Sequence, residues 1–145
     1  MEQIYMNEAV KQAKKSFKYD EVPVGCVIVK DNKIISRAHN KKEKFNNPLN
    51  HAEVLAIKKA CGKLKTWRLD GCTLYTTSEP CVMCIGAISL ARIKKVTYAV
   101  ENKKFGFSHF IEGNRIMNFN IIVKKMDGDF TVEKLLKDFF KNKRK

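Results

Sequence analysis

The sequence predicts an α/β fold built on a central sheet of about five strands, with helices packed against it. Short runs rich in β-branched and aromatic residues alternate along the chain with segments whose apolar residues recur at helical spacing. Helices placed between strands favour parallel strand pairing. The chain has 145 residues and contains no repeat or linker, so we expect one domain over residues 1–145.

The N-terminal part of the chain predicts a helix followed by a hairpin. Apolar residues recur at helical spacing from Met6, so an amphipathic helix should run to about Phe17. Residues 24–30 and 34–39 have the composition of strands. Asp31-Asn32-Lys33 lies between them and is a turn-like cluster, which indicates that the two strands form a hairpin.

The middle of the chain alternates between helix and strand. The polar segment 40–50 predicts a loop that leads into a helix over residues 51–61. Residues 73–78 predict a strand, residues 81–91 a helix, and residues 95–100 a further strand. This succession is the main reason for placing helices against a sheet.

The C-terminal region predicts a fifth strand over residues 120–125 and a final helix over residues 131–141. Thr131 is a candidate N-cap of that helix, because its hydroxyl can accept a hydrogen bond from a first-turn N–H. The inner face of the helix should carry Leu135, Leu136 and Phe139.

Two short motifs together supply the ligands of a catalytic zinc site. His51 lies in His-Ala-Glu, and Cys81 and Cys84 lie in Pro-Cys-Val-Met-Cys. Catalytic zinc is held by three protein ligands and keeps a fourth position for water, whereas structural zinc takes four. Cys81 and Cys84 are three residues apart, so on a helix they project from one face. Pro80 suits a helix start, where the thiolate form that metals require is favoured.

Glu53 is predicted to carry protons beside this metal. It follows His51 by two positions, about 200° around a helix of about 3.6 residues per turn, so it is poorly placed to bind the same ion. Taken alone, C-x-x-C also fits a redox pair or half of a structural zinc cluster, and H-x-E is a weak signal. In combination, H-x-E…P-C-x-x-C is the signature of zinc nucleobase deaminases.

The chain resembles the bacterial tRNA adenosine deaminases, which convert the wobble adenosine of an anticodon to inosine. The resemblance runs from about residue 9 to residue 100 and returns near the C-terminus. Besides both zinc motifs, the matching residues are Glu21-Val22-Pro23-Val24-Gly25, Asn40, Asn47-Pro48, Thr73-Leu74-Tyr75, Glu79, Gly86-Ala87, Arg92-Ile93 and Phe139-Phe140. The resemblance implies a three-layer α/β/α cytidine-deaminase-like fold with a central mixed sheet. The two ligand-bearing helices would meet at one end of that sheet.

The same resemblance implies hydrolytic deamination, with one Zn²⁺ per chain and a tRNA anticodon stem-loop as substrate. Zinc lowers the pKa of bound water toward 7. Glu53 would pass a proton to a ring nitrogen while hydroxide attacks the carbon that bears the amine. Asn40 would hydrogen-bond the base, and the backbone N–H of Ala52 would contact it. From its position alone, Asn40 is equally a turn residue that ends a strand.

The charge of the chain suits a phosphate-rich partner. Its 29 basic and 15 acidic residues give a net charge of +14. Only five of the basic residues are Arg, and such a Lys-rich bias also arises from genome composition. Phe139 and Phe140 precede a basic tail that includes Arg144, and stacking surfaces beside positive charge are typical of single-strand binding. Alternatively, both aromatics are core residues of an amphipathic helix.

Two other functions fit part of the sequence. Guanine deaminases share the His-x-Glu form, but they typically have a bulkier Pro-Phe-Gly step where this chain has Pro23-Val24-Gly25. Cytidine deaminases commonly carry Cys in place of His51. A non-catalytic, zinc-stabilised RNA-binding module would need a fourth ligand, such as Cys72 or His39, and would leave Glu53 without a role.

One segment departs from the family pattern. Residues 101–109 stand where the family usually has an Asp and a loop of small residues, and Asn102 replaces that Asp, which is thought to contact the sugar near the target base. We hypothesise that Asn102 relaxes the preference for a ribose 2′-hydroxyl, because an amide is a neutral contact. Phe105 and Phe107 either stack on a splayed base or fold back onto the core.

The sequence predicts a reduced, cytoplasmic protein without a membrane segment. The N-terminal residues include Glu2 and Glu8 and lack the apolar stretch of a signal peptide. No run approaches the roughly 18 apolar residues that a transmembrane helix needs. Outside the zinc motif, Cys26, Cys61 and Cys72 are interpreted as small apolar residues with free thiols.

The resemblance also implies a homodimer whose partner helps to form the RNA surface. Ile85, Ile88 and Leu90 follow the zinc motif, and they fit either such an interface or the core. The sequence does not decide between these two positions.

Overall fold

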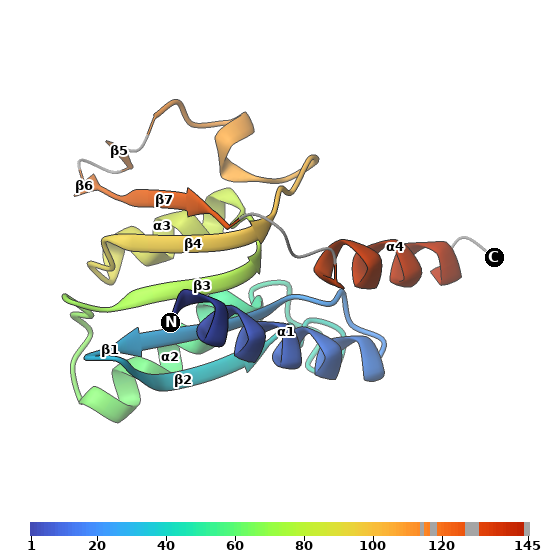
Figure 1. Cartoon of the computed structure of the whole chain (residues 1–145), viewed down its shortest axis with the longest axis horizontal. Coiled ribbons are helices and arrows are strands. Elements are labelled where there is room, and N and C mark those ends of the chain that lie inside the picture. Colours follow the sequence, from blue (N-terminus) through green and yellow to red (C-terminus); the bar gives the residue numbers. More distant parts are fainter. Residues whose placement is uncertain (114, 117–118, 127–130, 144–145) are drawn as a thin grey trace.

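A five-stranded mixed sheet lies at the centre of the computed structural model, which describes residues 1–113, 115–116, 119–126 and 131–143 (Figure 1). The α-helices are α1 (Glu2–Lys18), α2 (Ala52–Leu64), α3 (Val82–Leu90) and α4 (Thr131–Lys143). The strands of the sheet are β1 (Gly25–Lys30), β2 (Lys33–His39), β3 (Thr73–Ser78), β4 (Lys95–Val100) and β7 (Ile122–Lys125). The predicted α/β class is therefore confirmed.

The sheet has the order β2-β1-β3-β4-β7 and combines both kinds of pairing. Strand β1 pairs antiparallel with β2 and with β3, whereas β3 pairs parallel with β4, and β4 parallel with β7. The antiparallel β1–β2 pair is a hairpin whose turn residues, Asp31 and Asn32, both have positive φ angles of 51° and 61°. Two positive φ angles in succession are what a type I′ turn requires, so the predicted hairpin is confirmed.

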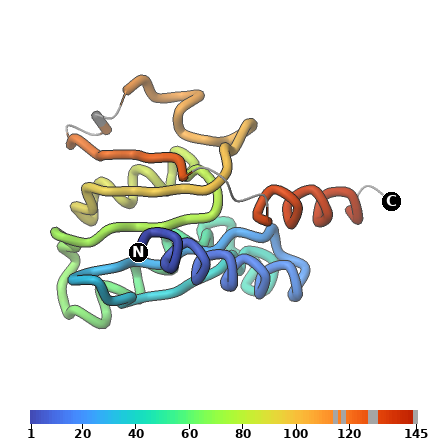
Figure 2. The backbone as a smooth tube through the Cα atoms, viewed as in Figure 1, coloured from blue at the N-terminus to red at the C-terminus, as the bar shows by residue number. Residues whose placement is uncertain are grey.

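Helices cover both faces of the sheet, as a three-layer fold requires. Helix α1 contacts β1, β2 and β3 on one face, while α2 packs on β1 and β2 from the other face and contacts α3 (Figures 1 and 2). Along β1, Cys26 and Ile28 join the core cluster on the α2 side, and Val27 and Val29 join the cluster on the α1 side. All four are buried, because a strand covered on both faces has no solvent side.

The predicted fifth strand differs from the observed one. Residues 120–125 were expected to form one strand, but Asn120 belongs to β6 (Phe119–Asn120), which pairs with β5 (Arg115–Ile116) in a separate two-stranded ribbon. Ile121 is buried between the two, and the Ile122 N–H bonds the Lys94 carbonyl to start β7 on the edge of the main sheet. The apolar pattern of residues 120–125 does not indicate that Asn120 pairs with one strand and Ile122 with another.

The three residues that fit either a subunit interface or the core lie in two different environments. Ile85 and Ile88 are fully buried in the core cluster under α3, whereas Leu90 is exposed at the end of that helix. Within the described ranges, no helix is both long and apolar enough to cross a membrane.

Gly25 lets α1 approach β1 closely. A Cβ at this position would overlap the Ala9 carbonyl oxygen and lie 2.5 Å from the Ala13 nitrogen, both in the backbone of α1. Backbone atoms cannot rotate away as a side chain can, so the helix itself would have to move. Gly25→Ala should therefore lower the free energy of unfolding by about 3 kcal/mol. Chemical denaturation of the purified variant measures this loss.

Gly62 is the matched control for this substitution. It lies inside α2, and a Cβ there would meet no atom within 4 Å. Because Ala favours a helix interior over Gly, Gly62→Ala should raise the free energy of unfolding by about 0.5–1 kcal/mol. Equal effects of the two substitutions would contradict the close approach at Gly25.

Candidate metal centre and active site

The three predicted metal ligands are brought together at the N-termini of α2 and α3. His51 is the N-cap of α2, and Cys81 is the N-cap of α3, with Cys84 in the first turn of the same helix. Helix α3 follows β3, so Cys81 lies just beyond the carboxyl end of a strand that pairs in parallel with β4. Ligand-binding sites gather at such strand ends in α/β folds. The two helices are also in contact with each other.

The distances between the three ligand atoms fit a single zinc ion. His51 Nδ1 lies 3.7 Å from Cys81 Sγ and 3.5 Å from Cys84 Sγ, and all three atoms lie within 4.8 Å of one another. Zinc takes sulfur at about 2.3 Å and nitrogen at about 2.0 Å, which at tetrahedral angles sets the two atoms about 3.5 Å apart. A set of one imidazole and two thiols also matches the ligand preference of zinc.

In the described residues, the group of potential ligands contains His51, Cys81 and Cys84 and no fourth member. Cys72 and His39, the fourth ligands that a structural zinc module would require, lie outside this group. Three protein ligands leave one position open for water, which is the arrangement of a catalytic site.

The two cysteines and the histidine of this group shift one another's pKa values. A hydrogen bond from Cys84, supported by His51, lowers the pKa of Cys81 to about 4. The same hydrogen bond and burial raise the pKa of Cys84. The hydrogen bond with Cys81 raises the pKa of His51. The protonation states of the two thiols and the imidazole are therefore coupled. A bound cation would favour the thiolate form of both cysteines.

Glu53 lies beside the ligand group without belonging to it. It is the second residue of α2 and only 4 % exposed. Burial raises the pKa of its carboxyl to about 7, and the neighbouring Cys84 and His51 partly oppose that shift. The charge of Glu53 also acts on Cys26 of β1, whose thiol is fully buried and has a raised pKa, chiefly through burial. A carboxyl group with a pKa near neutrality can both accept and return a proton.

Asn40 and Ala52 bond each other in the structure. The Ala52 N–H donates to Asn40 Oδ1 at 2.8 Å, and Asn40 Nδ2 donates to the Val22 carbonyl at 3.1 Å. The Ala52 N–H has a single hydrogen, so this bond occupies the donor that was predicted to contact a base. Asn40 thereby links the end of β2 to the start of α2 and holds the helix that carries His51 and Glu53.

A second buried glutamate organises the loop after β4. Glu79 accepts hydrogen bonds from the Ser108 N–H at 3.0 Å, the Ser108 hydroxyl at 2.6 Å and the Asn102 N–H at 3.3 Å. Gly106 pairs with Cys81 as an isolated bridge, and a Cβ on it would lie 2.5 Å from the Glu79 carboxyl. The loop is thus attached to the start of α3. The sequence pattern around Glu79 does not indicate this anchoring role, although Glu79 directly precedes Pro80.

Glu79→Gln should loosen this loop, because the amide NH₂ offers donors where three donors already converge. We expect the free energy of unfolding to fall by about 1–3 kcal/mol. Hydrogen exchange should show faster exchange of the Ser108 and Gly106 amides. Glu101→Gln is the control, since Glu101 is exposed and its ion pair with Lys125 lies on the surface. Unchanged protection in Glu79→Gln would contradict the anchoring role.

The remaining predicted substrate contacts lie in different environments. Asn102 Oδ1 accepts from the Phe105 N–H at 3.0 Å within the loop. Phe105 is 59 % exposed, whereas Phe107 is buried in the core, so only Phe105 presents its ring to solvent. Phe139 is buried against Phe17 of α1, while Phe140 is 45 % exposed. Arg144 lies outside the described residues.

A histidine, two cysteines and a buried, non-ligating glutamate occur together in the zinc-dependent nucleobase deaminases, and the fold and site define this class. The profile of the MafB19-like deaminase family matches residues 1–144. The chain therefore belongs to that deaminase family.

Individual relatives agree with this assignment. A tRNA-specific adenosine deaminase of Streptococcus pyogenes serotype M18 is 54 % identical over 102 residues, which cover 70 % of this chain and 64 % of the relative. The match thus spans less than two-thirds of that relative. A solved structure from a study of A-to-I editing by tRNA:A34 deaminases has a TM-score of 0.83 at 31 % identity, covering 92 % of this chain and 99 % of that one.

Guanine deaminases are also similar. The structure of guanine deaminase from Bacillus subtilis has a TM-score of 0.69 at 33 % identity and covers 98 % of this chain and 92 % of that one. The resemblance to the tRNA adenosine deaminases and the predicted mixed-sheet fold are both confirmed.

Proposed function

We propose that this protein catalyses the hydrolytic, zinc-dependent deamination of the wobble adenosine of a tRNA anticodon to inosine. The observation that carries the proposal is the placement of buried Glu53 beside a three-ligand site, in a chain whose relatives include tRNA adenosine deaminases. Water adds to the carbon that bears the amine, and ammonia leaves, so adenine and water give hypoxanthine and ammonia.

The chemistry divides between the metal and Glu53. His51, Cys81 and Cys84 would hold a zinc ion, which would supply Lewis acidity and lower the pKa of a water toward 7. Glu53 accepts the proton of that water and delivers it to a ring nitrogen of the base. It then transfers a further proton to the departing amine.

Binding of the base is proposed for residues around this centre. Asn40 retains a second hydrogen on Nδ2 and a second lone pair on Oδ1 beyond the two bonds described. The exposed rings of Phe105 and Phe140 are available to stack on unpaired bases. Arg144, four positions after Phe140 in the sequence, would add positive charge to RNA binding. The high net charge of +14 favours an RNA substrate in the same way.

The test is deamination by the purified, zinc-loaded protein. The substrates are an anticodon stem-loop with adenosine at the wobble position, the same stem-loop with guanosine there, free guanine and free cytosine. We expect inosine only from the first substrate. Conversion of free guanine alone would overturn the proposal in favour of the second candidate, guanine deamination, which the Bacillus subtilis structure supports.

A cytoplasmic homodimer is the proposed form of the enzyme. A tRNA substrate requires access to the tRNA pool, and all five cysteines are free thiols, as in a reducing compartment. Exposed Leu90 and Val82 of α3 are the apolar residues proposed for the contact between subunits.

A further inference from the structure

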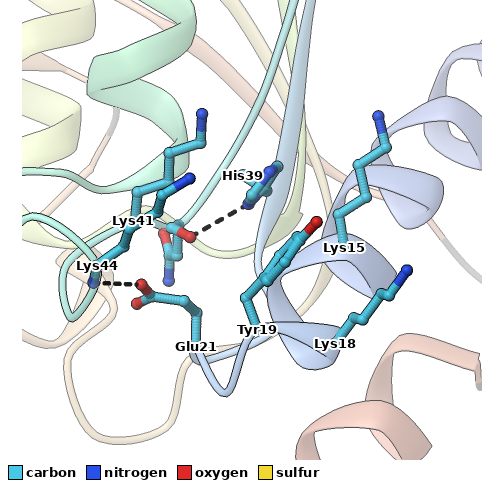
Figure 3. A pocket seen from close by; sticks show the side chains of 8 residues that line it. Lys15, Lys18, Tyr19, Glu21, His39, Lys41 and Lys44 are labelled. Atoms are coloured by element: carbon cyan, nitrogen blue, oxygen red, sulfur yellow. Dashed lines mark hydrogen bonds between the residues drawn. The ribbon is translucent and has the colours of Figure 1, made fainter.

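A pocket lies between the C-terminal end of α1 and the loop after β2. Its volume is about 370 Å³. The lining residues are Lys15, Lys18, Tyr19, Glu21, His39, Asn40, Lys41 and Lys44 (Figure 3). Asn40 connects this pocket to the candidate metal centre, because its side chain bonds Ala52 next to the metal ligand His51.

The four lysines outnumber the single carboxylate of the lining, so this pocket carries net positive charge. In the described part of the chain, none of them forms an ion pair. The one carboxylate of the lining, on Glu21, is buried, and it accepts the backbone N–H groups of Glu43 at 3.0 Å and Lys44 at 2.9 Å. These hydrogen bonds stabilise the loop after β2, because both carboxylate oxygens of Glu21 accept from its backbone N–H groups.

His39 experiences the positive field of this pocket. Burial lowers the pKa of its ring, and the charges of Lys41, Lys15 and Lys59 lower it further. Its Nδ1 lies 3.1 Å from Ser16 Oγ and 3.2 Å from the Asn40 carbonyl, so the ring is fixed against the protein. Several cations that repel one another around a concave surface form a site for an anion.

Aromatic rings lie beside the lysines. Tyr19 is 60 % exposed, and Lys44 Nζ lies 5.9 Å from the centre of its ring and 5.5 Å from that of exposed Phe45. Positive charge next to exposed aromatic rings suits a ligand that combines phosphates with bases. Lysine is a strong phosphate ligand because its ammonium group has three donors.

We propose that this pocket binds a backbone phosphate of the RNA near the target nucleotide. This inference rests on the proposed function, since the phosphate would belong to the same RNA that carries the deaminated base. The pocket and the catalytic centre are joined through Asn40, which holds the end of β2 to the start of α2. A phosphate held by α1 and the loop after β2 would orient the strand whose base reaches Glu53.

The test compares two double variants of equal charge. Lys15→Gln with Lys44→Gln removes cations from α1 and from the loop, on opposite sides of the pocket (Figure 3). Lys63→Gln with Lys95→Gln is the matched control: both lysines are exposed, one near the C-terminal end of α2 and one at the start of β4, away from the metal ligands.

Fluorescence anisotropy with a labelled anticodon stem-loop measures Kd across a salt series. In the pocket variant we expect Kd at low salt to rise about tenfold. The slope of log Kd against log salt should fall by about one unit, as expected for one lost phosphate contact. The control should change Kd less than threefold and leave kcat at saturating RNA at the wild-type value.

Equal losses in the two double variants would overturn the inference, because they would show a general charge effect. A wild-type Kd and salt slope in the pocket variant, with deamination intact, would overturn the pocket but leave the proposed function standing. A wild-type protein that neither binds nor deaminates the stem-loop would overturn both. Inorganic phosphate is titrated separately, following the His39 ring signals by NMR. Saturation by phosphate without any effect of the lysines on RNA affinity would identify a free anion as the ligand and overturn the RNA contact.

Discussion

Glu53→Gln should reduce the rate of deamination by about 100- to 10,000-fold, the range expected when a general acid–base group is removed. Glutamine keeps the size and polarity of the side chain but cannot accept and return a proton. Glu53 stands outside the metal-ligand group, so the variant should still bind one zinc per chain. Single-turnover kinetics on the anticodon stem-loop, with metal analysis on the same sample, measures both quantities.

The separation between rate and metal content is what makes this result informative. If Glu53→Gln lost zinc together with activity, its role would be to hold the site, and the proton-transfer role would be wrong. Glu53→Asp provides a further comparison, since it keeps the acid but shortens the reach by one methylene. We expect partial activity from it, below wild type and above Glu53→Gln.

Removal of the metal should have the second largest effect, on both stability and activity. The three ligands lie at the starts of α2 and α3, so zinc joins two helix termini that the unfolded chain does not hold together. When free zinc exceeds Kd about 1,000-fold, binding stabilises the folded state by about 4 kcal/mol. Chelation should therefore lower Tm by roughly 10 °C and abolish deamination.

Cys84→Ala should reproduce both effects, and Cys61→Ala is its control. Cys61 lies on α2 outside the ligand group and is only partly buried. Metal analysis should give one zinc per chain for Cys61→Ala and much less for Cys84→Ala. Full zinc content in Cys84→Ala, or a Tm of the wild type that chelator leaves unchanged, would contradict a site built from these three ligands.

The local features of this fold could be predicted because neighbouring residues produce them. The turn at Asp31-Asn32 has its signal in the turn residues themselves. The ligand-bearing helices were expected at residues 51–61 and 81–91, and they are observed at Ala52–Leu64 and Val82–Leu90, with the ligands His51 and Cys81 at their N-caps. The three-residue spacing of Cys81 and Cys84 places both side chains on the same face at the start of one helix.

The long-range features could not be predicted in this way. Phe139 and Phe140 are adjacent and chemically identical, yet packing against Phe17 buries the first and leaves the second exposed. Residues 120–125 have strand composition throughout, but the change from β6 to β7 depends on which backbone groups are free on the edge of the sheet.

The sequence by itself determined the class of fold, because helical and strand periodicity are properties of consecutive residues. It also predicted the three metal ligands and the proton carrier, because their motifs are short and local. Only the tertiary structure decided that Glu79 anchors the loop after β4, and that lysines from α1 and from the loop after β2 surround one pocket. The partners in these contacts are about 25 residues or more apart in the chain, so no local pattern relates them. The hydrogen-bonded carboxylate of Glu79 and the lysine-lined pocket form only when the sheet brings those segments together.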